Sequence, residues 1–307
     1  MTSLMTHATG RHEIGPAVIA IGVFDGVHIG HQRLIADTIT IAREKRCASC
    51  VLTFDRDPDQ VVTPTHPAPQ LTSFDEKVRL ISALGPDAIL VVPFDEWLAS
   101  LSPDDFCIDV LLDAAEPIAC VVGHDFRFGT KASGDADTLR ALGSLHGFQV
   151  VTHPLVHHGG APITSTRIRG LIAAGEVEEA AALLGRNHSL DGVVERGKRL
   201  GHRIGVPTAN LHVGAEFALP APGVYAGWAS VAGERHPAAL SVGVPPTFPD
   251  ATCVLEAHLI GFEGDLYECT LTVEFAHRLR DQRAFGSNEE LAEAIRADVE
   301  RARILLG

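Results

Sequence analysis

The chain has 307 residues, of which 46% are hydrophobic and 21% are charged, a composition typical of a globular protein long enough for two domains. Its 25 lysines and arginines against 39 aspartates and glutamates give a net charge of -14, which argues against non-specific binding to nucleic acid or to an anionic membrane surface. No apolar run approaches the ~20 residues that span a bilayer, so we expect no membrane segment.

The N-terminal residues Met1 to Pro16 are polar and contain no apolar signal-peptide segment. We expect them to be disordered and the protein to be cytoplasmic. The six cysteines lie mostly in apolar segments, as reduced and buried thiols do. Cys47 and Cys50 form a C-x-x-C pattern, but without a second pair at metal-ligand spacing a redox or zinc role is disfavoured.

The first half of the chain predicts short buried strands that alternate with helices. Strands are expected at 17–21, 50–54, 88–92, 119–122 and 149–152. Helices are expected at about 32–45, 73–84, from 102, near 138–145 and at 176–184. Such alternation implies parallel pairing, right-handed crossovers and a doubly wound α/β sheet. Ligands of these sheets bind at the carboxyl ends of the strands.

The first predicted strand ends in the segment Gly22-Val-Phe-Asp-Gly-Val-His-Ile-Gly-His31. His28 and His31 lie where the turn passes into a helix, beside backbone amides that have no partner within that helix. Such amides attract anions, Gly30 lets a phosphate approach the backbone, and imidazoles can donate hydrogen bonds to it. The segment therefore predicts a binding site for a nucleoside triphosphate. The alternative is an ordinary strand-turn-helix, which the flanking strand and helix disfavour.

Two further segments in this half follow predicted strands. Gly123-His-Asp-Phe-Arg-Phe-Gly129 has glycines at both ends and aromatic residues within, which suits either a ligand-binding loop or a packed surface loop. Pro162-Ile-Thr-Ser-Thr-Arg-Ile-Arg169 offers three hydroxyls at a helix start and two arginines one turn further on. N-capping needs one hydroxyl and does not need Arg169, so phosphate binding is favoured over simple capping.

From Arg186 to Ser287 the helical periodicity is lost, and we place a domain boundary between residues 186 and 187. Antiparallel strands are expected at about 190–196, 223–231, 238–242, 252–260 and 270–280, which favours a small β-barrel. Ser287 and Glu290 form a capping box at the start of a terminal helix. The apolar face that would pack on the barrel consists of Leu291, Ile295, Val299 and Ala302.

The segment Gly192 to Asn210 begins as a glycine-rich basic loop and ends in Pro-Thr-Ala-Asn. Its amides could wrap phosphates, although a flexible hairpin with solvated charges is commoner for such composition. Thr208 and Asn210 put neutral oxygens at alternate positions, on one side of an extended chain. Hard oxygen ligands of this kind suit Mg²⁺ that bridges nucleotide phosphates.

These segments, in this order, resemble the motifs of the bifunctional riboflavin kinase/FMN adenylyltransferases, the prokaryotic FAD synthetases. The resemblance starts at Gly22–His31 and runs over nearly the whole chain. It implies an α/β fold with a doubly wound, Rossmann-like nucleotidylyltransferase domain at 1–186 and an antiparallel β-barrel riboflavin kinase domain with a terminal helix at 187–307. It also implies phosphorylation of riboflavin by ATP to FMN, and adenylylation of FMN by a second ATP to FAD and pyrophosphate.

The resemblance further implies roles for individual residues. It implies that Glu256 is the base that accepts the proton of the riboflavin ribityl hydroxyl. Without the resemblance, Glu256 would be interpreted as an outward-facing strand residue. The resemblance gives His28 and His31 as catalytic residues of adenylylation. The residues implied for ATP and its phosphates are Gly22, Phe24, Gly30, Ser165, Thr166, Arg169, Gly197, Lys198 and Gly205. Those implied for the flavin are Asp125, Phe126 and Phe128, and those for Mg²⁺ are Thr208 and Asn210.

Several positions depart from the family pattern. Thr53-Phe-Asp-Arg56-Asp57-Pro58 has Asp57 where a histidine is usual, and the other departures are His124, Thr164, His202, Ser241, Gly261 and Glu268. They bear on rates and affinities more than on the fold. The alternatives are a divergent paralogue with one of the two activities, a flavin-binding sensor without activity, and a tRNA-type nucleotidylyltransferase relative, which the net charge disfavours. We expect riboflavin, FMN and ATP as small-molecule partners, with neither nucleic acid nor membrane; a homo-oligomer is compatible with the sequence.

Overall fold

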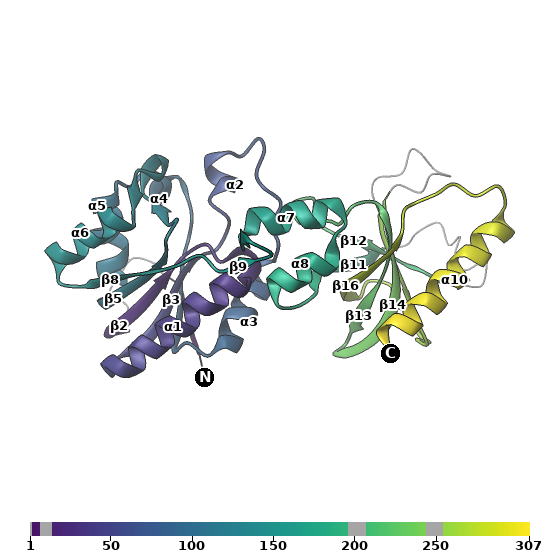
Figure 1. Cartoon of the computed structure of the whole chain (residues 1–307), viewed down its shortest axis with the longest axis horizontal. Coiled ribbons are helices and arrows are strands. Elements are labelled where there is room, and N and C mark those ends of the chain that lie inside the picture. Colours follow the sequence, from purple (N-terminus) through teal and green to yellow (C-terminus); the bar gives the residue numbers. More distant parts are fainter. Residues whose placement is uncertain (1, 7–13, 196–206, 244–253) are drawn as a thin grey trace. The chain divides into compact units, whose positions relative to one another are not determined.

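The computed structural model describes residues 2–6, 14–195, 207–243 and 254–307. The chain divides into two compact units, Met1–Ser165 and Thr166–Gly307. In Figure 1 the first unit runs from purple to teal and the second from teal-green to yellow. The domain boundary predicted between residues 186 and 187 stays a prediction.

The first unit is built on a six-stranded sheet with the order β1-β4-β3-β2-β5-β8, and all of its strand pairs are parallel. Its strands are Ser3–Thr6 (β1), Pro16–Ile21 (β2), Ala48–Phe54 (β3), Ala88–Val92 (β4), Glu116–Gly123 (β5) and Gln149–His153 (β8). The chain winds from β2 toward β3 on one side and later toward β5 on the other. The doubly wound sheet is confirmed, and its switch point lies at the carboxyl ends of β2 and β5.

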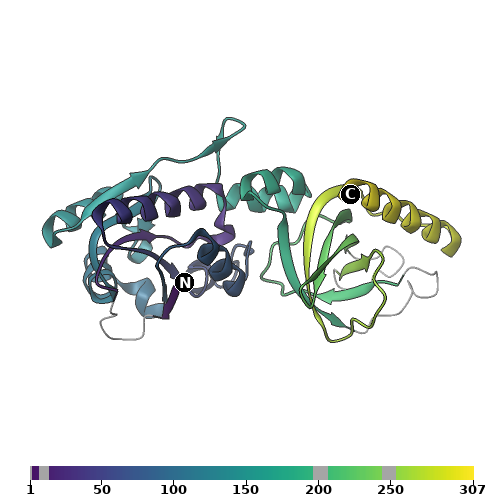
Figure 2. The ribbon, with the colours of Figure 1, turned by 90° about the horizontal axis from the view of Figure 1, so that it is seen from below.

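Helices cover both faces of this sheet (Figures 1 and 2). Val18 and Ala20 of β2 pack in the core beneath α1, whereas Ala17, Ile19 and Ile21 face the opposite core. The first face is covered by α1 (Ile29–Lys45) and α3 (Phe74–Leu84). The second is covered by α4 (Glu96–Ser100), a π-helical turn (Phe106–Leu112) and α6 (Ala136–His146).

Short elements complete the first unit. They are α2 (Asp59–Val62), α5 (Pro103–Asp105), the pair β6 (Arg127–Phe128) and β7 (Gly134–Asp135), and the hairpin β9 (His157–His158) and β10 (Ala161–Pro162). Two predicted caps are confirmed: Ser73 Oγ accepts the Glu76 N–H at 3.2 Å, and Ser102 Oγ accepts the Asp105 N–H at 3.1 Å.

The expectation of a disordered N-terminus is wrong for β1. Ser3 to Thr6 pair with Ala88 to Val91 of β4, and the Ser3 N–H donates to Asp87 O at 2.9 Å. Thr2 Oγ1 adds a bond to Pro86 O at 2.8 Å. Because β4 would otherwise present an open row of peptide groups, pairing along its edge orders a segment whose own sequence gives no strand signal.

The second unit begins with two helices and continues into a closed antiparallel barrel with the order β11-β12-β15-β14-β13-β16. The helices are α7 (Ser165–Ala174), whose first residue belongs to the first unit, and α8 (Val177–Leu184). The strands are His188–Glu195 (β11), Ala209–His212 (β12), Gly223–Val231 (β13), Glu234–Gly243 (β14), Val254–Leu259 (β15) and Thr270–Arg280 (β16). The predicted barrel is confirmed, with β12 as a strand that the sequence analysis does not predict.

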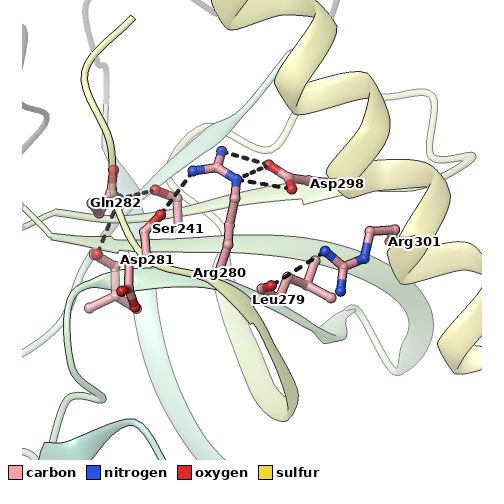
Figure 3. Close-up of polar contacts among 8 residues, drawn as sticks. Ser241, Leu279, Arg280, Asp281, Gln282, Asp298 and Arg301 are labelled. Atoms are coloured by element: carbon pink, nitrogen blue, oxygen red, sulfur yellow. Dashed lines mark hydrogen bonds and ion pairs between the residues drawn. The ribbon is translucent and has the colours of Figure 1, made fainter.

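The terminal helix α10 (Asn288–Leu306) lies along the outside of the barrel, in yellow in Figure 2. Ala302 is fully buried against Val224, Ala226 and Leu279. Asp298, which is 5% exposed, accepts hydrogen bonds from Arg280 at the end of β16, with 2.7 Å between Oδ2 and Nη2 (Figure 3). A buried carboxylate therefore ties the helix to the barrel.

We expect Asp298→Asn to lower the free energy of unfolding of the barrel by about 3 kcal/mol, because it leaves the Arg280 guanidinium without its counter-charge. Urea unfolding can be followed by the fluorescence of Trp228 on β13, in a Trp97→Phe background that removes the second tryptophan of the chain. The matched control is Glu300→Gln, which breaks the exposed pair with Arg303 on the same helix and should cost less than about 1 kcal/mol. Equal losses of unfolding free energy in the two variants would contradict the conclusion that the Asp298–Arg280 pair ties the helix to the barrel.

Candidate active sites

The turn between β2 and α1 is strained and is held from outside. Phe24 and Val27 have positive φ angles of 55° and 38°, a costly conformation for a β-branched residue such as valine. The buried Asp25 carboxylate accepts the Leu71 N–H at 3.0 Å and the Thr72 N–H at 3.2 Å. Two amides from a segment distant in sequence thus fix the shape of this turn.

Two histidines stand at the end of the turn. The His31 N–H donates to His28 Nδ1 at 3.2 Å, so His28 caps α1, and the helix begins three residues before the predicted start at residue 32. Since Nδ1 accepts this bond, the proton of a neutral His28 is on Nε2. The two rings stack with 3.5 Å between their centroids, and the Phe24 ring meets His31 edge-on at 5.2 Å.

His31 is the more unusual of the two histidines. Its Nδ1 is shielded from solvent and has no hydrogen-bond partner within the part of the chain that the structure describes. Burial, followed by the nearby charges of His28 and Lys77, holds the pKa of His31 well below its ordinary value of 6.5. At neutral pH His31 is therefore a neutral imidazole. A buried polar atom without a partner is costly unless a ligand or water satisfies it.

Gly22 and Gly30 keep these rings in place. A Cβ on Gly30 would lie 3.1 Å from His28 Cε1, and one on Gly22 would lie 3.0 Å from Phe24 Cζ. Phe24 is 2% exposed, so its ring forms part of the packing of the turn. A Cβ at either position would fit only if the neighbouring ring moved by a few tenths of an ångström, so the packing of this segment favours glycine at both, whether or not a phosphate approaches the backbone.

Lys77 of α3 is a buried cation that the sequence analysis missed. Its Nζ donates to Phe54 O at 2.7 Å and to Val23 O at 3.3 Å, which joins the carboxyl ends of β3 and β2. Burial lowers the pKa of Lys77, while the charges of Asp25, Asp57 and Asp55 oppose that shift. No sequence signal marked this lysine, because it lies on a helix face that looks solvated.

Asp57 lines a small open pocket at this edge of the sheet, together with Asp25 and Lys77. Its neighbour Arg56 is held by Asp55, with 2.9 Å between Nη2 and Oδ2, and this contact raises the pKa of Arg56. Asp57 Oδ1 accepts the Asp59 N–H at 3.2 Å. The Asp57 carboxylate thus lies near the carboxyl ends of β2 and β3.

The Gly123–Gly129 loop presents two stacked aromatic rings. Phe126 and Phe128 lie 5.4 Å apart at an angle of 16°, and Phe128 also contacts Phe106 at 5.5 Å. Phe128 is buried, Phe126 is half-buried and Asp125 is exposed. Phe128 is therefore a packed residue that supports Phe126.

The segment before Arg169 is divided between the two units. Ser165 Oγ donates to the backbone oxygen of Asp25 at 2.9 Å, so within the first unit the start of α7 is joined to the strained turn. Thr166, which is exposed, and Arg169, which is half-buried, follow on α7 in the second unit. Arg167 between them bonds Glu179 of α8 at 3.2 Å.

A second candidate site lies on the outer surface of the barrel. Glu256 of β15 lies directly opposite Asn210 of β12 and Ser241 of β14. Residues opposite each other in antiparallel strands share a face. Leu255 and Ala257 point into the barrel core, so the row of three faces outward. Burial nevertheless raises the pKa of Glu256 above its ordinary value of 4.5.

Two side chains that the sequence analysis missed support this row. His258, two residues after Glu256, donates from Nδ1 to Pro207 O at 2.7 Å and so fixes the start of the Pro-Thr-Ala-Asn segment. Gln282 Nε2 donates to Ser241 Oγ at 2.9 Å and to Val242 O at 3.2 Å (Figure 3). Only the i, i+2 spacing from Glu256 could have marked His258, and nothing in the sequence marked Gln282.

The side chains of Thr208 and Asn210 fit a hard cation. Both are half-buried neutral oxygen donors, and Asn210 lies opposite Glu256 in the strand register. Across the described residues, no group of three or more His, Cys, Asp or Glu could hold a metal ion. A Mg²⁺ that takes most of its ligands from phosphates and water requires only one or two protein oxygens.

Three predicted phosphate-binding residues, Gly197, Lys198 and Gly205, lie outside the described residues, as does His202. The C-x-x-C pair is described. Cys50 is buried in β3, where burial raises the pKa of its thiol to about 12, and Cys47 is half-buried. Both are free thiols, and a buried thiol that stays protonated, such as that of Cys50, is poorly suited to redox exchange.

Comparisons with known proteins match nearly the whole chain. The FAD synthetase family model matches residues 11–167 and the riboflavin kinase family model matches residues 184–306. The crystal structure of a macrolide-efflux protein from Streptococcus pneumoniae superposes with a TM-score of 0.85 at 28% identity, over 98% of each chain. Among the described helices, none is long and apolar enough to cross a membrane.

Curated relatives match over almost their full lengths. The bifunctional riboflavin kinase/FMN adenylyltransferase of Pseudomonas fluorescens is 36% identical over 96% of both chains. The proteins of the same name from Bacillus subtilis and Escherichia coli K12 are each 33% identical, over 96% and 97% of this chain and 94% and 97% of their own. Together with the two family models, this similarity shows that the chain belongs to the bifunctional riboflavin kinase/FMN adenylyltransferase family.

Proposed function

We propose that the chain makes FMN and FAD at two separate sites. It is a riboflavin kinase, which transfers the γ-phosphate of ATP to riboflavin, and an FMN adenylyltransferase, which transfers AMP from a second ATP to FMN and releases pyrophosphate. The observation that carries this proposal is the match of both family models, in order, on one chain whose relatives bear both activities in their names.

Adenylylation takes place at the β2–α1 turn in this proposal. An oxygen of the FMN phosphate attacks the α-phosphorus of ATP, and the bond to the departing pyrophosphate breaks. The FMN phosphate is already an anion at neutral pH, so no general base is needed, and the protein supplies position and hydrogen-bond donors. His31 donates as a neutral imidazole, and His28 can donate from Nε2. The shielded Nδ1 of His31, which has no hydrogen-bond partner among the described residues, supports a ligand here.

Further residues complete the proposed nucleotide and flavin contacts. Ser165, Thr166 and Arg169 bind phosphate oxygens of ATP, the arginine through a charge-assisted bond. The half-buried Phe126, backed by Phe128, offers a flat apolar surface to the isoalloxazine ring, and Asp125 offers an acceptor to its polar edge.

Phosphorylation of riboflavin takes place at the outer row of the barrel. Glu256 accepts the proton of the ribityl hydroxyl, whose oxygen attacks the γ-phosphorus of ATP while ADP departs. Burial supports this role because a base whose pKa lies closer to the working pH transfers protons more effectively. Gly197, Lys198 and Gly205 are proposed to bind the phosphates. Thr208 and Asn210 would hold Mg²⁺, which would neutralise part of the phosphate charge.

The remaining assignments are also proposals. We assign residues 1–186 to adenylylation and residues 187–307 to the kinase, in a cytoplasmic protein. The net charge of -14 supports small-molecule substrates and argues against a nucleic-acid partner.

We expect Glu256→Gln to lower the rate of FMN formation by ~10²- to 10⁴-fold, the usual cost of losing a general base. FAD formation from supplied FMN should not change. In the parent, the rate of FMN formation should rise with pH through an apparent pKa above 4.5, and the variant should lack this rise. Glu234→Gln is the matched control, since Glu234 is an exposed barrel glutamate at the start of β14, outside this row. Equal loss of both activities in Glu256→Gln would show that the base is misassigned.

His31→Ala and Arg169→Ala should each lower FAD formation by ~10²- to 10³-fold, the cost of removing a preorganised donor from a charged transition state. Riboflavin phosphorylation should be spared, as measured with riboflavin and ATP in the same preparations. His153→Ala and Arg140→Ala serve as controls, because these residues pair with Asp37 and Asp137. A parental rate of FAD formation in either test variant would refute the phosphate site.

Asp57→His should raise kcat/KM for adenylylation by roughly ten- to thirty-fold. Two unit charges ~4 Å apart interact by ~4 kcal/mol at an effective dielectric near 20, and solvent reduces this to ~1 to 2 kcal/mol between Asp57 and a bound triphosphate. Adenylylation is accordingly the weaker activity of the parent. Asp59→His, which alters an exposed neighbour, should have little effect. An unchanged or lower rate of FAD formation in Asp57→His would exclude the electrostatic explanation.

A further inference from the structure

The C-terminal end of α7 is held by an arginine of the barrel. Arg278 on β16 donates from Nη1 to the carbonyl oxygen of Ala174, the last residue of α7, at 2.7 Å. Its Nη2 donates to Asp281 Oδ1 at 2.8 Å and to Pro222 O at 3.4 Å. A cation at this position satisfies a carbonyl that has no partner within the helix and complements the helix dipole.

Gly175 makes room for this guanidinium. A Cβ on Gly175 would lie 1.8 Å from Arg278 Nη1, and the residue has a φ of +78°, which glycine adopts without strain. Below it, Tyr225 is fully buried and donates from its hydroxyl to Ala221 O, and the Ala221 N–H donates to Ile172 O of α7 at 3.2 Å. The end of α7 thus bonds to the rest of the second unit at two points.

The next helix is joined to the barrel by the same strand. Glu178 of α8 accepts the backbone N–H of Arg278 at 3.1 Å and contacts His277 Nδ1 at 3.4 Å. Val177 is fully buried in the barrel core with Tyr225. Residues 168–183, which make up most of α7 and α8, lie between the segments matched by the two family models, yet they belong to the same compact unit as the barrel.

Arg278 and the proposed kinase base, Glu256, lie on strands that are not neighbours in the barrel. In the closed order β11-β12-β15-β14-β13-β16, β16 and the strand of Glu256, β15, are separated by two strands in either direction. Arg169 lies five residues before Ala174 on α7, about 7.5 Å along the helix at 1.5 Å per residue. A displacement at the Arg278 end of α7 therefore carries over to Arg169 while β15 keeps its own contacts.

We propose that Arg278, a residue of the segment matched by the riboflavin kinase family, is a positioning residue for FAD formation. It holds the C-terminal end of α7 and so sets the position of the ATP-binding residues Thr166 and Arg169 on the same helix. This inference rests on the proposed role of those two residues in adenylylation.

The test compares Arg278→Met, Arg278→Lys and Arg235→Met in the full chain. Arg278→Met should lower kcat/KM for ATP in FAD formation at least ~10-fold, since small displacements of positioning groups carry such costs, and should leave FMN formation within about two-fold. Arg278→Lys can still donate to Ala174 O and should recover most of the loss. Arg235 is the matched control, because it is a barrel arginine that pairs with Glu274 at 2.8 Å and stacks on Trp228.

Hydrogen–deuterium exchange supplies a second readout. In Arg278→Met, exchange should increase in residues 166–186 and stay unchanged in β12 and β15. An unchanged kcat/KM for FAD formation despite faster exchange in α7 would overturn the proposal. Loss of FMN formation equal to that of FAD formation would overturn it as well, because it would indicate general damage to the barrel.

A double-mutant cycle separates this inference from the function on which it rests. If Arg278 acts through Arg169, the losses in Arg169→Ala and Arg278→Met should be clearly less than additive in the double variant. A normal rate of FAD formation in Arg169→Ala would refute the phosphate site and this inference together. If FAD formation is impaired in Arg169→Ala but normal in Arg278→Met, the positioning role alone is refuted.

Discussion

The Asp25 carboxylate is the interaction on which the proposed adenylylation site depends. It compensates for the backbone strain at Phe24 and Val27 by accepting amide hydrogen bonds from the 71–72 segment. In that turn His28 and His31 stack at the start of α1, and within the described part of the chain His31 Nδ1 has no hydrogen-bond partner. The backbone oxygen of the same aspartate receives the Ser165 hydroxyl, which joins the start of α7 to the turn. This buried carboxylate thus shapes the proposed site.

Burial shifts the pKa of a key side chain in opposite directions at the two proposed sites. At the turn it lowers the pKa of His31 and keeps that imidazole neutral, so it can donate a hydrogen bond to phosphate. On the barrel it raises the pKa of Glu256, which makes that carboxylate a better proton acceptor near neutral pH. In both cases the environment comes from backbone topology: a strand-to-helix turn at the switch point of a parallel sheet, and a cross-strand row between β12, β15 and β14.

Sequence reasoning succeeded where the signal is local. Apolar runs and capping boxes predicted β2 to β5, β8 and the terminal helix, and they indicated the barrel. It failed where a partner distant in sequence decides the outcome: β1 exists because β4 offers an open edge, and Lys77 is buried because two strand ends need a donor. No local pattern in the sequence marks Asp298 as buried or Arg278 as a partner of α7, because both interactions depend on residues distant in sequence. Phe24 stays a predicted ATP contact, and the packing of its ring within the turn is a feature that no local signal in the sequence indicates.

One measurement tests the central claim, that a single chain performs both reactions, most directly. The protein is incubated with riboflavin, ATP and Mg²⁺, and FMN, FAD, ADP and pyrophosphate are quantified over time. Two sites on one chain predict FMN first and FAD later, with one ADP released for each riboflavin phosphorylated and one pyrophosphate for each FAD. FMN without FAD and pyrophosphate would contradict the claim and indicate a single-activity paralogue. Bound riboflavin with no product would contradict it in favour of a flavin sensor.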